Sequence, residues 1–193
     1  MAVRTKTLRS AIVACLLCLG FWQLGQGAYI PAKAWLAQEL MQRAWTRSAA
    51  GHDQPVPWPW ADTWPVARLA AKSGDIDLIV LAGGSGRTLA FGPGHLSASA
   101  LPGQNGNAVI AGHRDTHFSF LRDVEVGESL VIETISGRKH VYKVVGIEVV
   151  DSRRGSLQLD TAVPMLSLVT CYPFDATDPG GPLRYVVTAK MLF

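Results

Sequence analysis

The sequence predicts a small, mostly β domain that follows an N-terminal membrane helix. Two observations favour the β domain: short apolar runs of β type recur from residue 75 onward, and Gly- and Pro-rich turn segments separate them. The runs expected to form strands are 76–81, 108–111, 129–135, 140–150, 166–171 and 185–192. Six or more short strands in about 120 residues, with few helical patterns, indicate a mostly antiparallel barrel or sandwich.

The N-terminal part of the chain is the candidate membrane segment, because no charged residue lies between Arg9 and Lys33. Residues 11–22 are almost wholly apolar, and a helix over this uncharged stretch is long enough to cross roughly 30 Å of hydrocarbon. We therefore expect a cytoplasmic tail over residues 1–9 and an uncleaved transmembrane signal anchor over residues 10–30. The alternative is a cleaved signal peptide, for which the small residues after position 24 offer only a weak site.

The charge distribution predicts where the folded part lies. The chain carries 18 basic and 15 acidic residues, a net charge of +3, and three of the basic residues (Arg4, Lys6 and Arg9) lie among the first ten. The rest is therefore balanced at 15 of each sign. The positive-inside rule places the N-terminus in the cytoplasm and the folded domain on the periplasmic or outer side of the inner membrane. A nucleic-acid binder would carry a basic stripe on its domain, so the balanced charge excludes that class.

Residues 31–74 are expected to link the anchor to a β domain over 75–193. Residues 32–50 contain good helix formers with a loose apolar face, which predicts a helix next to the membrane. After it, prolines alternate with Val and Trp over residues 55–60. Because proline fixes φ and removes a backbone donor, this segment predicts a stiff, extended connector.

Three polar side chains at the ends of apolar runs are candidates for chemistry: Cys171, His113 and Arg184. A thiol at the end of a strand is well placed to act as a nucleophile if a nearby base or positive charge favours the thiolate. The histidine could move a proton and the guanidinium could stabilise an oxyanion. Taken alone, each residue has a simpler interpretation: Cys171 as a buried thiol, His113 as a structural histidine and Arg184 as part of a surface ion pair. Together they suit acyl transfer through a thioester.

Three segments closely resemble the His, T-L-x-T-C and Arg motifs of sortases: Ala111-Gly112-His113-Arg114-Asp115, Leu168-Val169-Thr170-Cys171 and Leu183-Arg184-Tyr185. The order also agrees, with 58 residues from His113 to Cys171 and 13 from Cys171 to Arg184. Ser167 departs from the family pattern, where a Thr is usual. The resemblance covers roughly residue 75 to the C-terminus. The Pro/Trp connector and the run 113–118 are most similar to the sortase branch of Gram-negative, often marine, proteobacteria.

The resemblance implies a closed eight-stranded sortase-type β-barrel with short helices, and a cysteine transpeptidase activity. Cys171 would cleave an LPxTG-like sorting signal of a protein substrate between Thr and Gly, and the acyl group would pass to an amine. By the same motifs, His113 would be the general acid and then the general base, and Arg184 would hold the oxyanion or the substrate. Thr170 is a weaker candidate for lining the substrate groove. No cofactor is expected.

Two other functions remain open at the level of sequence. One is a thiol hydrolase on the same scaffold, which releases its acyl group to water. The other is a membrane-tethered β domain that binds an extended peptide without catalysis, with Cys171 merely buried. His113 and His117 are four residues apart, as zinc ligands on a helix would be, but no third ligand is evident and no metal site is expected.

Overall fold

The computed structural model describes residues 2–71, 76–177 and 180–192, and the side chains of residues 2–12, 24, 26 and 28 lie outside this description. The chain divides into two units, Met1–Glu39 and Leu40–Phe193. The start of the β domain predicted at residue 75 falls outside the described residues.

A single helix, α1 (Ala2–Ala49), contains the segment predicted as the anchor (10–30) and all but the last residue of the helix predicted over 32–50. Pro31 lies inside it. Among the residues that the structure describes, no helix is long and apolar enough to cross a membrane, so the transmembrane anchor predicted over 10–30 is not found there. Residues 10–12, 24, 26 and 28 of that segment are among those whose side chains are not described.

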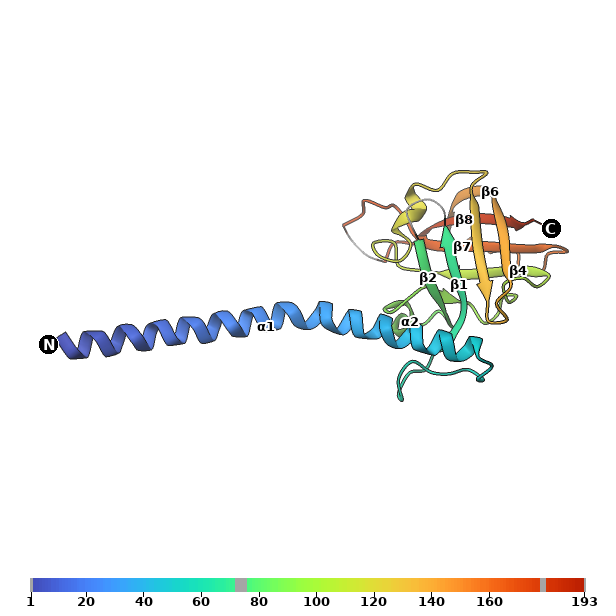
Figure 1. The fold of residues 1–193 in the computed structure, drawn as a ribbon. Coiled ribbons are helices and arrows are strands. Elements are labelled where there is room, and N and C mark those ends of the chain that lie inside the picture. Colours follow the sequence, from blue (N-terminus) through green and yellow to red (C-terminus); the bar gives the residue numbers. More distant parts are fainter. Residues whose placement is uncertain (1, 72–75, 178–179, 193) are drawn as a thin grey trace. The chain divides into compact units, whose positions relative to one another are not determined.

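In the described part of the second unit, eight strands close into a barrel (Figure 1). The strands are β1 (Pro65–Ala71), β2 (Ile76–Ala82), β3 (Gly94–His95), β4 (Gly106–Ala111), β5 (Ser129–Thr134), β6 (Lys139–Asp151), β7 (Pro164–Cys171) and β8 (Leu183–Met191). Their order around the barrel is β1-β2-β3-β4-β7-β8-β6-β5. Two neighbouring pairs, β2 with β3 and β4 with β7, are parallel, and the other six pairs of the described strands are antiparallel. Two short helices, α2 (Gly86–Leu89) and η1 (Ser119–Arg122), lie between strands.

All six strands predicted from the sequence are present, with ends that differ by at most two residues. The closed order confirms the eight-stranded barrel and excludes the sandwich. Two strands were not predicted. β1 lies in the segment 31–74, which was interpreted as a connector. Its pattern does not predict a strand because three of its seven residues are alanines, which have low β propensity. β3 has only two residues and is too short to show a periodicity.

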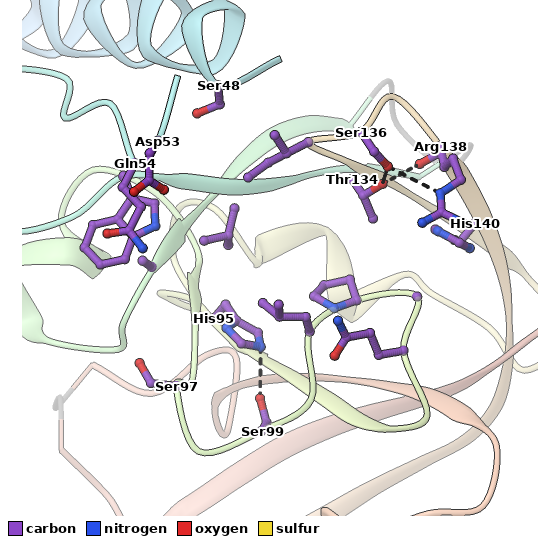
Figure 2. A pocket seen from close by; sticks show the side chains of 18 of the residues that line it. Ser48, Asp53, Gln54, His95, Ser97, Ser99, Thr134, Ser136, Arg138 and His140 are labelled. Carbon is purple, nitrogen blue, oxygen red and sulfur yellow. Dashed lines mark hydrogen bonds between the residues drawn. The ribbon is translucent and has the colours of Figure 1, made fainter. Parts of the chain in front are cut away.

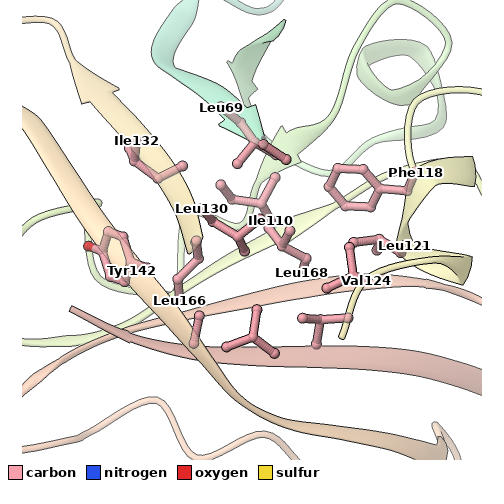
Figure 3. Packing of buried hydrophobic residues seen from close by; sticks show 14 of the residues in the cluster. Leu69, Ile110, Phe118, Leu121, Val124, Leu130, Ile132, Tyr142, Leu166 and Leu168 are labelled. Atoms are coloured by element: carbon pink, nitrogen blue, oxygen red, sulfur yellow. The ribbon is translucent and has the colours of Figure 1, made fainter. Parts of the chain in front are cut away.

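The barrel interior is filled by aliphatic and aromatic side chains that alternate along the strands (Figure 3). Leu166 and Leu168 of β7 and Ile110 of β4 are fully buried there. Phe118 and Leu121, from the segment between β4 and β5, are buried in the same cluster. Burying each such side chain stabilises the fold by roughly 1.5–3 kcal/mol. The ends of β4 and β7 are therefore anchored in a packed core, which makes them rigid supports for a site.

Candidate active site

Strand register brings the three candidate residues to one end of the barrel. Ala111 of β4 pairs with Val169 of the parallel strand β7, so His113 and Cys171 each come two residues beyond that pair. Across the antiparallel pair of β7 and β8, Cys171 lies directly opposite Arg184. Residues opposite each other in such a ladder have Cβ atoms about 4.5–5.5 Å apart on the same face. The sequence motifs are thus adjacent in space as well as ordered along the chain.

The thiol faces outward from the barrel wall. Leu166, Leu168 and Thr170 alternate into the interior, so the two-residue period of β7 directs Cys171 to the opposite face. Cys171 is half-buried and His113 is exposed. The alternative in which Cys171 is merely a buried structural thiol is therefore not what the structure shows.

Two hydrogen bonds fasten the end of β4 to β7 immediately before the candidate residues. The Gly112 N–H donates to the Val169 carbonyl at 3.1 Å, and the Thr170 hydroxyl donates to the Gly112 carbonyl at 2.8 Å. A Cβ atom at Gly112 would lie 2.8 Å from the ring of Phe118, so only glycine fits without a shift. Thr170 is 2% exposed. Its hydroxyl is used inside the wall and holds the position of Gly112, while a contribution of Thr170 to a substrate groove stays a prediction.

The Arg184 side chain is partly committed to its own loop. Its Nη1 donates to the carbonyls of Gly181 at 2.6 Å and Leu183 at 2.8 Å. Nε and Nη2 make no hydrogen bond to any residue in the described ranges. A guanidinium has five N–H groups in a fixed fork, so those two nitrogens retain donors for a substrate oxygen.

Charged and polar neighbours surround His113. Asp115 is paired with Arg114, and this hydrogen bond, reinforced by the charges of Arg114, His113 and Arg122, lowers the pKa of Asp115. Burial, together with the charge of His113, lowers the pKa of His117, and a hydrogen bond to the Phe91 backbone acts weakly against this. His117 is therefore held in its neutral form beside an exposed histidine.

Sequence reasoning assigned no role to Arg114, although it lies directly after His113. Its guanidinium binds Asp115 and also reaches carbonyls of the loop that follows Cys171. The adjacent Arg114 and Asp115 could have suggested an ion pair, but the contact of Arg114 with the loop after Cys171 depends on the fold. Within the described ranges, no group of three or more His, Cys, Asp or Glu side chains is arranged to hold a metal ion.

A cavity of about 680 Å³ lies at the other end of the barrel (Figure 2). The turn between β5 and β6 and the loop between β3 and β4 line it, with Arg138, His140 and Ser99 among its side chains. His95 is buried there and its Nε2 lies 2.8 Å from the Ala100 carbonyl, which is a structural contact. None of Cys171, His113 and Arg184 lines this cavity. The candidate chemistry is therefore separate from it.

A closed β-barrel with a cysteine, a histidine and an arginine at the ends of neighbouring strands defines a class of candidate thiol enzymes. The model of the sortase domain matches residues 69–192, so the chain belongs to the sortase family. This confirms the family resemblance found in the sequence motifs.

The relatives agree with this assignment. Sortase D of Bacillus subtilis (strain 168) is 33% identical over 115 residues, which cover 59% of this chain and 57% of that protein. The chain thus matches little more than half the length of this relative. Sortase A from Corynebacterium diphtheriae, as a lid mutant, has a TM-score of 0.63 at 26% identity and covers 84% of this chain and 95% of its own. A Clostridium perfringens sortase D5 transpeptidase shares the fold, with a TM-score of 0.61 at 22% identity over 79% of this chain and 89% of its own. Membership of the proteobacterial branch stays a prediction.

Proposed function

We propose that the barrel is a cysteine transpeptidase that transfers a peptidyl group through a thioester on Cys171. The observation that carries the proposal is the strand register, which sets Cys171 opposite Arg184 and at the same strand end as His113. The half-buried thiol on the outer face of β7 supports it, because a substrate can reach it there. Membership of the sortase family, shown by the match over residues 69–192, is the independent support.

The proposed reaction has two steps, with a role for each residue. The Cys171 thiolate attacks the carbonyl carbon of the scissile peptide bond, and a tetrahedral oxyanion forms near Arg184, whose Nε and Nη2 donate to it. The C–N bond then breaks as His113 gives a proton to the leaving amine. In the second step an incoming amine attacks the thioester and gives a proton to His113. The C–S bond breaks and the thiolate is restored.

The proposed substrate is an LPxTG-like sorting signal, cleaved between Thr and Gly, with an amine as the acceptor. This rests on the family and on the sequence motifs around His113, Cys171 and Arg184. Action on the periplasmic or outer side of the inner membrane stays a prediction from the basic N-terminal residues. The thiol hydrolase is the outcome to be distinguished, because water and an amine would compete for the same thioester.

Incubating the full chain with a fluorophore–quencher LPxTG peptide, with and without a primary amine, tests the proposal. We expect cleavage at Thr-Gly and a peptide–amine product. Cys171→Ala should abolish both, whereas the double variant Cys15→Ala/Cys18→Ala, which removes the two other cysteines, should keep both. Turnover by Cys171→Ala equal to wild type would refute the assignment. A free acid as sole product despite excess amine would favour the hydrolase.

A further inference from the structure

The loop that follows Cys171 is held by two arginines from the segment that follows His113. Arg114 donates from Nη1 to the Pro173 carbonyl and from Nη2 to the Ala176 carbonyl at 2.8 Å. Arg122 donates from Nη2 to the Phe174 carbonyl at 3.1 Å. Three carbonyls of one short loop are thus bound by side chains from the histidine's segment.

The Arg114 side chain is largely buried and is held in place by Asp115. Its side chain is only 10% exposed, and the Asp115 carboxylate accepts from Nε at 2.6 Å and from Nη2 at 3.0 Å. With the two loop carbonyls, four of its five N–H groups have partners. The hydrogen bond to Asp115 raises the pKa of Arg114, so the guanidinium remains charged. Charge-assisted hydrogen bonds of this kind are roughly twice as strong as neutral ones.

The loop also packs against aromatic rings. The Arg122 guanidinium lies 5.3 Å from the centre of the Phe174 ring, and that ring packs edge-on against Tyr185 at 5.0 Å. Tyr185 is the neighbour of Arg184 on β8 and packs against the barrel core. The loop is therefore held both by arginine donors to its carbonyls and by a ring that packs against the core.

We propose that Arg114 is a positioning residue, which couples the loop after Cys171 to the backbone next to His113 and so keeps nucleophile and proton donor in register. This rests on the proposed transpeptidase function. Loop carbonyls need donors. Without the guanidinium, the Pro173 carbonyl would keep only the Ala176 N–H at 3.4 Å and the Ala176 carbonyl would turn to water, so the loop would sample more conformations. The role requires a planar fork that reaches two carbonyls and a carboxylate at once. Lysine carries the same charge but lacks that fork.

The test compares the full chain with its Arg114→Ala and Arg114→Lys variants. Arg68→Ala is the matched control, because Arg68 makes the same two-pronged pair with Asp77 between β1 and β2 and, within the described residues, no hydrogen bond to a loop carbonyl. Hydrogen exchange is measured in fragments covering 171–177, where the N–H groups of Tyr172 and Ala176 donate to the carbonyls of Leu183 and Pro173. Peptide cleavage gives kcat and KM in parallel.

We expect both Arg114 variants to speed exchange of this loop by about tenfold or more, while β5 is unchanged. Their kcat should fall by about 100-fold with KM altered by less than about threefold, because orientation and not ground-state binding is lost. Arg68→Ala should change neither quantity. Arg122→Ala, which removes the contacts to Phe174 and leaves the Arg114 bonds in place, should speed exchange by a smaller factor and carries the test if Arg114→Ala does not fold.

Loop exchange equal to wild type in Arg114→Lys and Arg122→Ala would overturn the inference, whatever their activity. Full activity and full protection in Arg114→Lys would show that charge alone is sufficient, and would also overturn it. Failure of the proposed function would show differently, as a wild-type chain without Cys171-dependent turnover. The exchange comparison would still decide whether Arg114 holds the loop.

Discussion

Replacing Thr170 with valine should weaken both the fold and the activity, because one buried hydroxyl joins the ends of β4 and β7. Valine keeps the branched shape but removes the donor to the Gly112 carbonyl, a bond of 2.8 Å. Because Gly112 is buried, its carbonyl would be left unsatisfied once the Thr170 donor is removed. An unsatisfied buried group costs about 1–3 kcal/mol. At roughly 2–4 °C per kcal/mol for a domain of this size, a loss of about 2 kcal/mol lowers Tm by about 4–8 °C.

The consequence for activity follows from position, since Gly112 directly precedes His113 and Thr170 directly precedes Cys171. A small displacement of one relative to the other should lower kcat by about tenfold or more. Circular dichroism melting and peptide cleavage measure the two effects. Thr188→Val is the matched control: Thr188 lies on the neighbouring strand β8, and within the described ranges its hydroxyl has no hydrogen bond. Its unfolding free energy should change by less than about 0.5 kcal/mol. A Thr170→Val melting temperature equal to that of Thr188→Val would refute the reasoning.

Two further variants test the surroundings of His113. Gly112→Ala places a Cβ 2.8 Å from the Phe118 ring and should lower the free energy of unfolding, measured by urea denaturation, by about 1–3 kcal/mol. Gly146→Ala, whose Cβ would have nothing within 4 Å, should lower it less. Equal losses of unfolding free energy would contradict the packing argument. Because burial lowers the pKa of His117 below its usual 6.5, the unfolded chain binds the proton more readily, and stability falls as pH drops through 6.5 toward the lower folded pKa. His117→Gln should make the unfolding free energy less dependent on pH in that window, and an unchanged slope would show that His117 does not cause it.

Strands with strong β-type runs could be predicted from the sequence, and their limits are close to those observed. β7 is an example, since its apolar run ends at the residue that the motif marks as the candidate nucleophile. β1 could not be predicted because its stability comes from pairing with β2 and β5 and from burial of alternate alanines and Leu69, not from propensity. Thr170 shows the same limit. Its place in a motif suggested contact with substrate, but the direction of its side chain depends on which face of the strand is the core.

The amino-acid sequence by itself determined the family, the mostly β class and the identity of the three candidate residues, since each lies where an apolar run meets a polar loop. Only the tertiary structure decided that His113, Cys171 and Arg184 are neighbours. Their meeting depends on the parallel register of β4 with β7 and the antiparallel register of β7 with β8, which arise when the barrel closes. The same closure brings Arg114 against the loop after Cys171. Local pattern encodes which residues could react, and long-range strand pairing encodes which of them meet.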